Sequence, residues 1–291
     1  MYNYIAYCFN IISNYKLENM TVGKYNPNFI DIQLNINCIT GFVNSEKTGI
    51  TKNDNTYCVS YNDLVYYIFF KEFRISVITR TLDRVVRTIS NIPMSILALE
   101  NSYFLLHCSS VLINNKLYAF MGDKGVGKST IAYKLINLRG ATPFSDDAIL
   151  QTPRGVYSRG NVFKVAKKDY GDNEEMFKRF VPYFFDDITG KIYLEYCDDR
   201  QRQSYYSQIN TIFWLQRSAD NSYRQESVNN ESEKTIMILN NLVGSKRINR
   251  YFAIYILDNL VGRIFHKTKV EILYVPAEKC TDKKVLSVNF D

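Results

Sequence analysis

Residues 116–129 read KLYAFMGDKGVGKS, an apolar run followed by a cluster of glycines. The chain has 13 glycines in 291 residues, and three of them, Gly122, Gly125 and Gly127, fall within eight positions. The cluster fits G-x-x-x-x-G-K-[ST], the pattern of a phosphate-binding loop, which requires a strand before it and a helix after it. An apolar strand precedes the glycines, and the spacing of apolar residues predicts a helix over 129–140. The stretch therefore predicts a strand-loop-helix unit that holds a nucleoside triphosphate.

Each residue type in this loop has a physical role in holding phosphate. Glycines reach positive φ and leave room for a ligand, so that consecutive backbone N–H groups can point at an anion. The following helix directs the positive end of its dipole to the same place. Lys128 supplies a cation for the β- and γ-phosphates, and the Ser129 hydroxyl can bind Mg²⁺. The predicted nucleotide-binding residues are Gly122, Asp123, Lys124, Gly125, Val126, Gly127, Lys128, Ser129 and Thr130.

Two adjacent acids follow this unit, Asp146 and Asp147, within a stretch predicted as a short strand. One carboxylate beside a phosphate loop can hold the metal, and a second can accept a proton from an attacking hydroxyl. Adjacent strand residues face opposite ways, so both acids can serve one site only at a strand end or a bulge. His107, on the predicted strand before the loop, could orient one carboxylate or share its proton. The structural alternatives are a solvated turn for the acids and a core position for the histidine.

The stretch over residues 105–150, LLHCSSVLINNKLYAFMGDKGVGKSTIAYKLINLRGATPFSDDAIL, resembles the catalytic core of HPr kinase/phosphorylase. In its motif order it especially resembles the shorter HPr-kinase-like proteins of peptide-natural-product clusters, including the kinases that phosphorylate lasso-peptide precursors. The shared order is a histidine strand, a hairpin, the glycine-rich loop, a helix ending in glycine, and a strand ending in two aspartates. The resemblance implies an α/β fold with a P-loop core like those of HPr kinase and phosphoenolpyruvate carboxykinase.

The same resemblance implies ATP and Mg²⁺ as cofactors and assigns roles to the site residues. Asp146 would be the general base with His107 in support, Lys128 would contact the phosphates, and Ser129 and Asp147 would lie at the metal. The glycine-rich signature that follows this core in HPr kinases is not found, so HPr itself is not the expected substrate. Further candidate cations for phosphate or acceptor are Lys167, Lys168 and Arg217.

The predicted function is an ATP- and magnesium-dependent kinase that phosphorylates a Ser or Thr hydroxyl of a ribosomal precursor peptide, as in lasso-peptide tailoring. Two alternatives remain open. One is a kinase for a small hydroxyl compound such as free serine or a sugar. The other is a non-catalytic regulator that binds nucleotide. Relatives of the core often form oligomers, so a homo-oligomer is also considered.

The remainder of the chain suggests two domains. Residues 1–98 are rich in alternating and β-branched segments, which predict a small antiparallel domain that could recognise the acceptor, with a polar turn cluster over 45–56. A helical pattern over 82–99 contains Pro93, which should kink or split it. Residues 99–291 form the predicted catalytic domain. Its later part predicts a buried strand over 209–217, a polar loop, two helices and a final strand.

Composition and charge further restrict the binding partners, the metal and the cellular compartment expected for this protein. The net charge of +7 is a mild excess, and basic residues do not cluster with aromatics, which argues against nucleic-acid binding. Six scattered cysteines without a CxxC pair, together with two histidines, argue against zinc and fit a reducing compartment. The sequence shows no signal peptide and no apolar run long enough to span a membrane, so a cytoplasmic protein is expected.

Overall fold

The computed structural model describes residues 1–17, 24–40, 49–61, 63–159, 162–167, 170, 177–186, 190–197, 204–220, 222–248, 251–252, 260–276 and 288–290. Within these residues the chain is mixed α/β, and it divides into two compact units. One unit holds Met1–Leu105 and Leu242–Leu257, and the other holds Leu106–Asn241 and Asp258–Asp291. The sequence near residue 242 gives no local sign that this segment belongs with the N-terminal residues. Among the described residues, no helix combines the length and the apolar character needed to cross a membrane.

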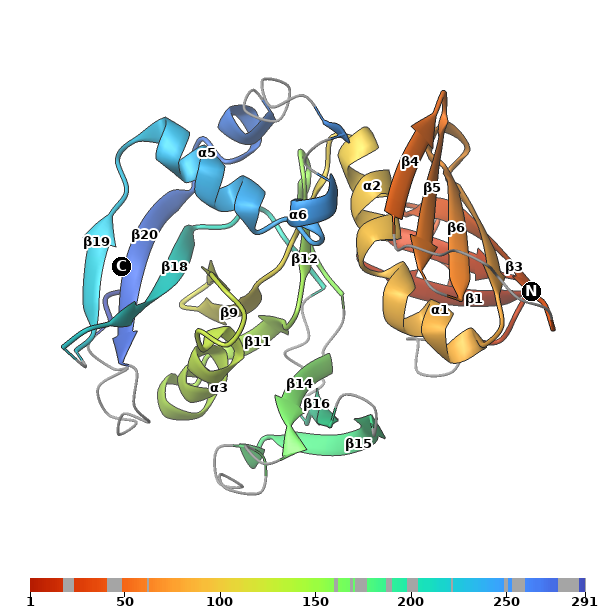
Figure 1. Cartoon of the computed structure of the whole chain (residues 1–291). Coiled ribbons are helices and arrows are strands. Elements are labelled where there is room, and N and C mark those ends of the chain that lie inside the picture. Colours follow the sequence, from red (N-terminus) through yellow and green to blue (C-terminus); the bar gives the residue numbers. More distant parts are fainter. Residues whose placement is uncertain are drawn as a thin grey trace. The chain divides into compact units, whose positions relative to one another are not determined.

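A seven-stranded sheet dominates the first unit (Figure 1). Its strands, in order across the sheet, are β1 (Tyr2–Ala6), β2 (Phe9–Ser13), β3 (Ile30–Cys38), β7 (Arg74–Thr79), β6 (Leu64–Phe69), β5 (Thr56–Tyr61) and β4 (Gly49–Asn53). The predicted β-rich character is confirmed, but the prediction of an antiparallel domain is wrong, because β3 pairs parallel with both β2 and β7. Alternation of apolar and polar residues reports which face is buried and carries no information on strand direction. Strand β4 also replaces part of the predicted turn cluster, since an edge strand tolerates exposed polar residues.

The predicted helical segment after this sheet is split, as Pro93 suggested. Helices α1 (Leu82–Ile89) and α2 (Ile92–Glu100) separate at Ser90 and Asn91. Pro93 lies in the first turn of α2, where its missing N–H removes no helical hydrogen bond. The short helices η1 (Phe70–Glu72) and α6 (Ser245–Ile248) also belong to this unit.

The second unit is built on a six-stranded sheet. Its order is β11 (Thr142–Ser145), β9 (Ser109–Ile113), β10 (Lys116–Met121), β18 (Thr211–Ser218), β20 (Lys269–Pro276) and β19 (Arg224–Ser227). The predicted hairpin is confirmed: Asn114 and Asn115 have φ angles of 49° and 56°, and they join β9 to β10 in antiparallel pairing. The two later strands are confirmed as β18 and β20. Strand β19 corrects the predicted polar loop, because it is a polar strand at the sheet edge.

Helix α3 (Lys128–Arg139) follows β10 and packs against β9 and β10. Gly140 ends it in the left-handed region at φ 65°, as predicted. The apolar residue Leu138 near its end is 43% exposed. Helix α5 (Glu231–Asn240) confirms the first of the two predicted C-terminal helices, whereas the second falls largely outside the described residues.

Two smaller sheets complete the second unit. Strands β12 (Ile149–Thr152), β13 (Gly155–Ser158) and β17 (Tyr205–Tyr206) pair antiparallel, and β8 (Phe104–Leu106) precedes β9 in the chain. Strands β14 (Val162–Ala166), β16 (Lys191–Tyr196) and β15 (Phe180–Asp186) form a three-stranded sheet. The Tyr133 ring of α3 packs on Phe163, Phe177 and Phe180 at centroid distances of 5.7, 4.8 and 5.3 Å. This aromatic cluster fixes the three-stranded sheet beside α3 and so places β14 near the glycine-rich loop.

Candidate functional site

The glycine-rich loop, Gly122–Gly127, joins β10 to the start of α3. At Gly122, with φ 131°, a Cβ would lie 2.8 Å from the Leu215 carbonyl oxygen of β18, so only glycine fits between the loop and the sheet. Gly125 and Gly127 also have positive φ angles, 84° and 112°, but a Cβ at either would meet nothing within 4 Å. The loop therefore leaves open space at these two positions, next to the N-terminal end of α3, where an anion is favoured.

Two basic side chains hold the shape of this loop. The buried Lys128 ammonium donates to the carbonyl oxygens of Gly122 at 2.8 Å and Asp123 at 3.1 Å. Burial lowers the pKa of Lys128, so an anion bound beside this ammonium would stabilise its charged form. Arg217 of β18 donates to the Gly125 carbonyl at 2.9 Å. In this structure Arg217, which the sequence suggested as a cation for the ligand, therefore contacts loop backbone.

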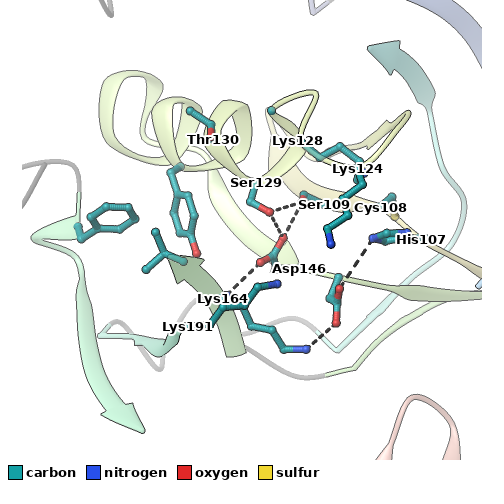
Figure 2. Close-up of a pocket in the computed structure, with 16 residues that line it drawn as sticks. His107, Cys108, Ser109, Lys124, Lys128, Ser129, Thr130, Asp146, Lys164 and Lys191 are labelled. Atoms are coloured by element: carbon teal, nitrogen blue, oxygen red, sulfur yellow. Dashed lines mark hydrogen bonds and ion pairs between the residues drawn. The ribbon is translucent and has the colours of Figure 1, made fainter. Parts of the chain in front are cut away.

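The two acids lie between β11 and β12, at the strand end that a shared site would require. Asp146 is buried, and both of its carboxylate oxygens accept hydrogen bonds (Figure 2). Its Oδ1 accepts from the hydroxyls of Ser109 at 2.5 Å and Ser129 at 2.9 Å, and its Oδ2 accepts from the Lys164 N–H at 3.0 Å. Burial raises the pKa of Asp146, and the Ser109 hydroxyl opposes that change. The carboxylate thus bridges the first turn of α3, strand β9 and strand β14.

Asp147 faces a different set of groups because its backbone adopts φ 75°, in the left-handed region. Its carboxylate lies 2.6 Å from the Lys164 ammonium, 3.6 Å from Arg159 and 3.8 Å from His107 Nε2. Burial opposes ionisation of this carboxyl, but the charges of Lys164 and then Arg159 hold its pKa well below the usual range. Asp147 is therefore ionised at neutral pH and half enclosed, with 37% of its side chain exposed.

His107 corrects one prediction. It lies in the break between β8 and β9, not within a strand, and its backbone N–H donates to the Asn241 carbonyl at 2.7 Å. Burial, followed by the nearby Lys128 charge, lowers the pKa of the imidazole. At neutral pH His107 is consequently a neutral group that can accept a proton.

One cavity of about 350 Å³ brings most of the predicted site residues together. This volume lies in the range of small-molecule sites. From the predicted set, the lining residues are His107, Lys124, Gly125, Gly127, Lys128, Ser129, Thr130, Asp146 and Asp147. Gly122, Asp123 and Val126 shape the loop without lining the cavity, and Val126 is buried in the core. Lys168 lies outside the described residues, and Lys167 lies away from the cavity with its ammonium 4.8 Å from the Phe185 ring centroid.

Sequence reasoning missed several groups at this site. Ser109 bonds to Asp146, Lys164 contacts both acids, and Lys191 of β16 lines the cavity. Ser109 carried a weak signal, since Ser109 and Ser110 are two polar residues at the start of a strand that continues with apolar residues. Lys164 and Lys191 carried none, because their role depends on how the three-stranded sheet packs.

The oxygens at the end of the loop suit Mg²⁺ bound together with a nucleotide. In the described part of the chain, no group of three or more His, Cys, Asp or Glu side chains could hold a metal alone. The Ser129 hydroxyl and the Asp146 carboxylate, 2.9 Å apart, offer two hard oxygen ligands. Mg²⁺ at nucleotide sites takes only one or two protein ligands and completes its shell with phosphate oxygens and water. The donor set therefore fits this ion.

Neither a protein-family model nor a curated protein matches the sequence. Among solved structures, the chain is similar to the Hpr(Ser) kinase/phosphatase from Coxiella burnetii, with 12% sequence identity and a TM-score of 0.29. The similarity covers 62% of this chain and 84% of that one. A TM-score of this size does not establish a shared fold, so the chemistry of the site is read from the geometry of the cavity itself.

The contact between Lys164 and Asp147 predicts a pH effect. Lys164→Met should raise the pKa of Asp147, because the closest cation is lost while the backbone bond from residue 164 to Asp146 is kept. A depressed carboxyl pKa stabilises the fold above the unfolded value of about 3.9, and this contribution is lost as pH falls through the folded pKa. In the variant the contribution should therefore be smaller and lost at a higher pH. Carbon-13 NMR titration of the aspartate carboxyl signals measures the shift.

Two control variants accompany this titration. Lys164→Arg should keep the depressed pKa of Asp147, since it retains the charge. Lys167→Met, a change outside the cavity, should leave it unaltered. The Asp147 signal is assigned by its absence in Asp147→Asn. If this signal titrates identically in wild type and Lys164→Met, Lys164 does not lower the pKa of Asp147.

Proposed function

We propose that this protein is an ATP- and magnesium-dependent kinase that transfers the γ-phosphoryl group to a Ser or Thr hydroxyl of a peptide. The observation that carries the proposal is the contact of Ser129 and Asp146 at the first turn of α3, beside the open Gly125 and Gly127. A cradle of backbone N–H groups, a buried ammonium and two oxygen ligands for the metal meet in one cavity. Phosphoryl transfer is catalysed mainly by such positioning and charge neutralisation.

The loop side of the cavity would hold the nucleotide tail. The N–H groups at the start of α3 have no intrahelical partners and can donate to phosphate oxygens. Lys128, now bonded to loop carbonyls, can reorient its ammonium toward the β- and γ-phosphates. Ser129 and Asp146 would hold Mg²⁺, which when bound neutralises charge on the phosphates. Arg217 donates to the Gly125 carbonyl and so would hold this part of the loop in position.

We assign the two acids roles opposite to those that the sequence resemblance implied, with Asp146 at the metal and Asp147 beside the acceptor. Both oxygens of Asp146 already accept bonds, and one of these comes from the metal-side Ser129, so we place Asp146 with the metal. Asp147 is more exposed and lies 3.8 Å from the neutral His107. These two residues would orient the acceptor hydroxyl and take its proton at His107 Nε2 or at the carboxylate.

The experiment that tests this function follows γ-labelled ATP with purified protein and Mg²⁺. Three reactions run in parallel, with a mixture of Ser- and Thr-containing peptides, with free serine and sugars, and without acceptor. The expected result is magnesium-dependent label on a peptide hydroxyl. Label on free serine or a sugar would replace the peptide with a small-molecule acceptor. Nucleotide binding without transfer to any of these acceptors would contradict the kinase and indicate a regulator.

A further inference from the structure

Two hydrogen-bond donors in the cavity have no hydrogen-bond partner among the residues that the structure describes. The Tyr133 hydroxyl of α3 lies in a side chain only 1% exposed, and it bonds to no other group in the described part of the chain. The Lys191 ammonium of β16 likewise makes no hydrogen bond or ion pair with a described residue. Val165 and Phe177 line the same cavity, and the Phe177 ring contacts the Tyr133 ring. A buried donor without a partner, as at Tyr133, is rare in proteins, because it loses its bond to water and gains none in return. Lys191 is exposed to solvent at the start of β16, so its ammonium is available to a ligand in the cavity.

The Tyr133 hydroxyl makes no hydrogen bond that would stabilise the fold of the described residues. Its ring fills the aromatic cluster through contacts with Phe163, Phe177 and Phe180, and a phenylalanine ring would make the same contacts. Burial, assisted by the Asp146 charge, raises the pKa of Tyr133 well above its ordinary value. The hydroxyl therefore keeps its proton and can donate it throughout the physiological pH range. A phenol and an ammonium that both donate are suited to a ligand with acceptor oxygens.

The Tyr133 hydroxyl and the Lys191 ammonium lie apart from the glycine-rich loop. Tyr133 comes five residues after Lys128, which corresponds to about 7 Å along the helix at a rise of about 1.5 Å per residue. Figure 2 draws Lys164 and Lys191 on the opposite side of Asp146 from Ser129. The nucleotide tail would occupy the Ser129 side, so the Tyr133 and Lys191 side is left for the second substrate.

We propose that Tyr133 and Lys191 form an oxyanion subsite that binds a carboxylate or phosphate group of the acceptor peptide, close to the hydroxyl that is phosphorylated. Val165 and Phe177 form the apolar wall against which the carbon skeleton of the acceptor packs. The assignment of this group to the acceptor rests on the proposed function. The binding of an oxyanion here stands on the buried, unpartnered Tyr133 hydroxyl and on the presence of the Lys191 ammonium in the same cavity.

The test compares three probes that share a three-carbon skeleton: glycerol, glycerate and glycerol 3-phosphate. Their binding is measured by calorimetry with wild type, Tyr133→Phe and Lys191→Met, each with and without saturating magnesium and a non-hydrolysable ATP analogue. Wild type should bind one anionic probe at least about ten-fold more tightly than glycerol. Each variant should lose roughly ten-fold of that preference, the effect of one charge-assisted hydrogen bond. The preferred probe identifies the oxyanion as carboxylate or phosphate.

Matched variants separate this role from a structural one. Tyr118→Phe removes a hydroxyl that donates to the Phe290 carbonyl, so it should lower the melting temperature. Tyr133→Phe should leave the melting temperature unchanged or higher, because no protein bond is lost. Lys167→Met, outside the cavity, should keep the full preference for the anionic probe.

The outcomes distinguish the subsite from the proposed kinase. Equal binding of glycerol and both anionic probes, or a preference that survives both substitutions, would overturn the subsite even if the nucleotide analogue binds. Destabilisation by Tyr133→Phe as large as that by Tyr118→Phe would also overturn it. If the analogue fails to bind but the anion preference depends on Tyr133 and Lys191, the kinase proposal fails and the oxyanion subsite stands.

Discussion

Asp146→Asn should reduce phosphoryl transfer by at least about 100-fold and should also weaken magnesium-dependent nucleotide binding. The Asp146 carboxylate accepts from Ser129 and Ser109 on one oxygen and from the Lys164 N–H on the other. An asparagine has only one acceptor oxygen, and its NH₂ group would face a donor. The variant would lose both the charge that attracts Mg²⁺ and the position of the Ser129 hydroxyl.

Asp147→Asn is the matched comparison. It should lower transfer to a similar extent but leave the affinity for magnesium and nucleotide within about two-fold, because Asp147 contacts Lys164, Arg159 and His107 and no residue of the loop. Calorimetry with a non-hydrolysable ATP analogue, with and without Mg²⁺, gives the affinity, and single-turnover transfer gives the rate. The opposite pattern, with intact binding in Asp146→Asn and lost binding in Asp147→Asn, would restore the assignment implied by the sequence resemblance.

Lys128→Met should have the second large effect, lowering nucleotide affinity and reducing transfer by roughly 100- to 1,000-fold. The ammonium is buried between the Gly122 and Asp123 carbonyls, at the point where the loop closes on α3. Methionine keeps the length of the side chain but supplies neither a charge for the phosphates nor a donor for the loop. The affinity is measured by calorimetry, and the melting temperature establishes that the variant is folded.

Lys128→Arg is the control for charge alone. The larger guanidinium cannot occupy the enclosed space of the ammonium in the same geometry, so the charge should restore only part of the affinity. A folded Lys128→Met protein with wild-type nucleotide affinity would show that the loop does not bind phosphate.

The local parts of the fold could be predicted from sequence because their signals are short-range. The Asn114–Asn115 turn, the glycine-rich loop and the end of α3 at Gly140 each depend on backbone angles that few residue types adopt, so composition reveals them. Pro93 marked the start of α2 for a similar reason. Strand direction in the first unit and the polar edge strands β4 and β19 could not be predicted, since neither leaves a periodic pattern.

The candidate site was predictable only on the loop side. His107, Lys128, Ser129 and the two acids were chosen from motif spacing, and the structure brings them to one cavity. The other side depends on contacts that are distant in sequence. Lys164 reaches the acids because the Tyr133 ring packs on Phe163, the residue before it in β14. No local pattern encodes such a contact, and Lys191 could not be predicted for the same reason.

We propose that the glycine-rich loop, Lys128 and the Ser129–Asp146 pair bind a magnesium-bound nucleotide in the cavity of the second unit. The most direct measurement is calorimetric titration of the wild-type protein with a non-hydrolysable ATP analogue in the presence and absence of Mg²⁺. We expect saturable binding of one nucleotide per chain that is stronger with Mg²⁺. Absence of binding under both conditions by folded protein would contradict the claim.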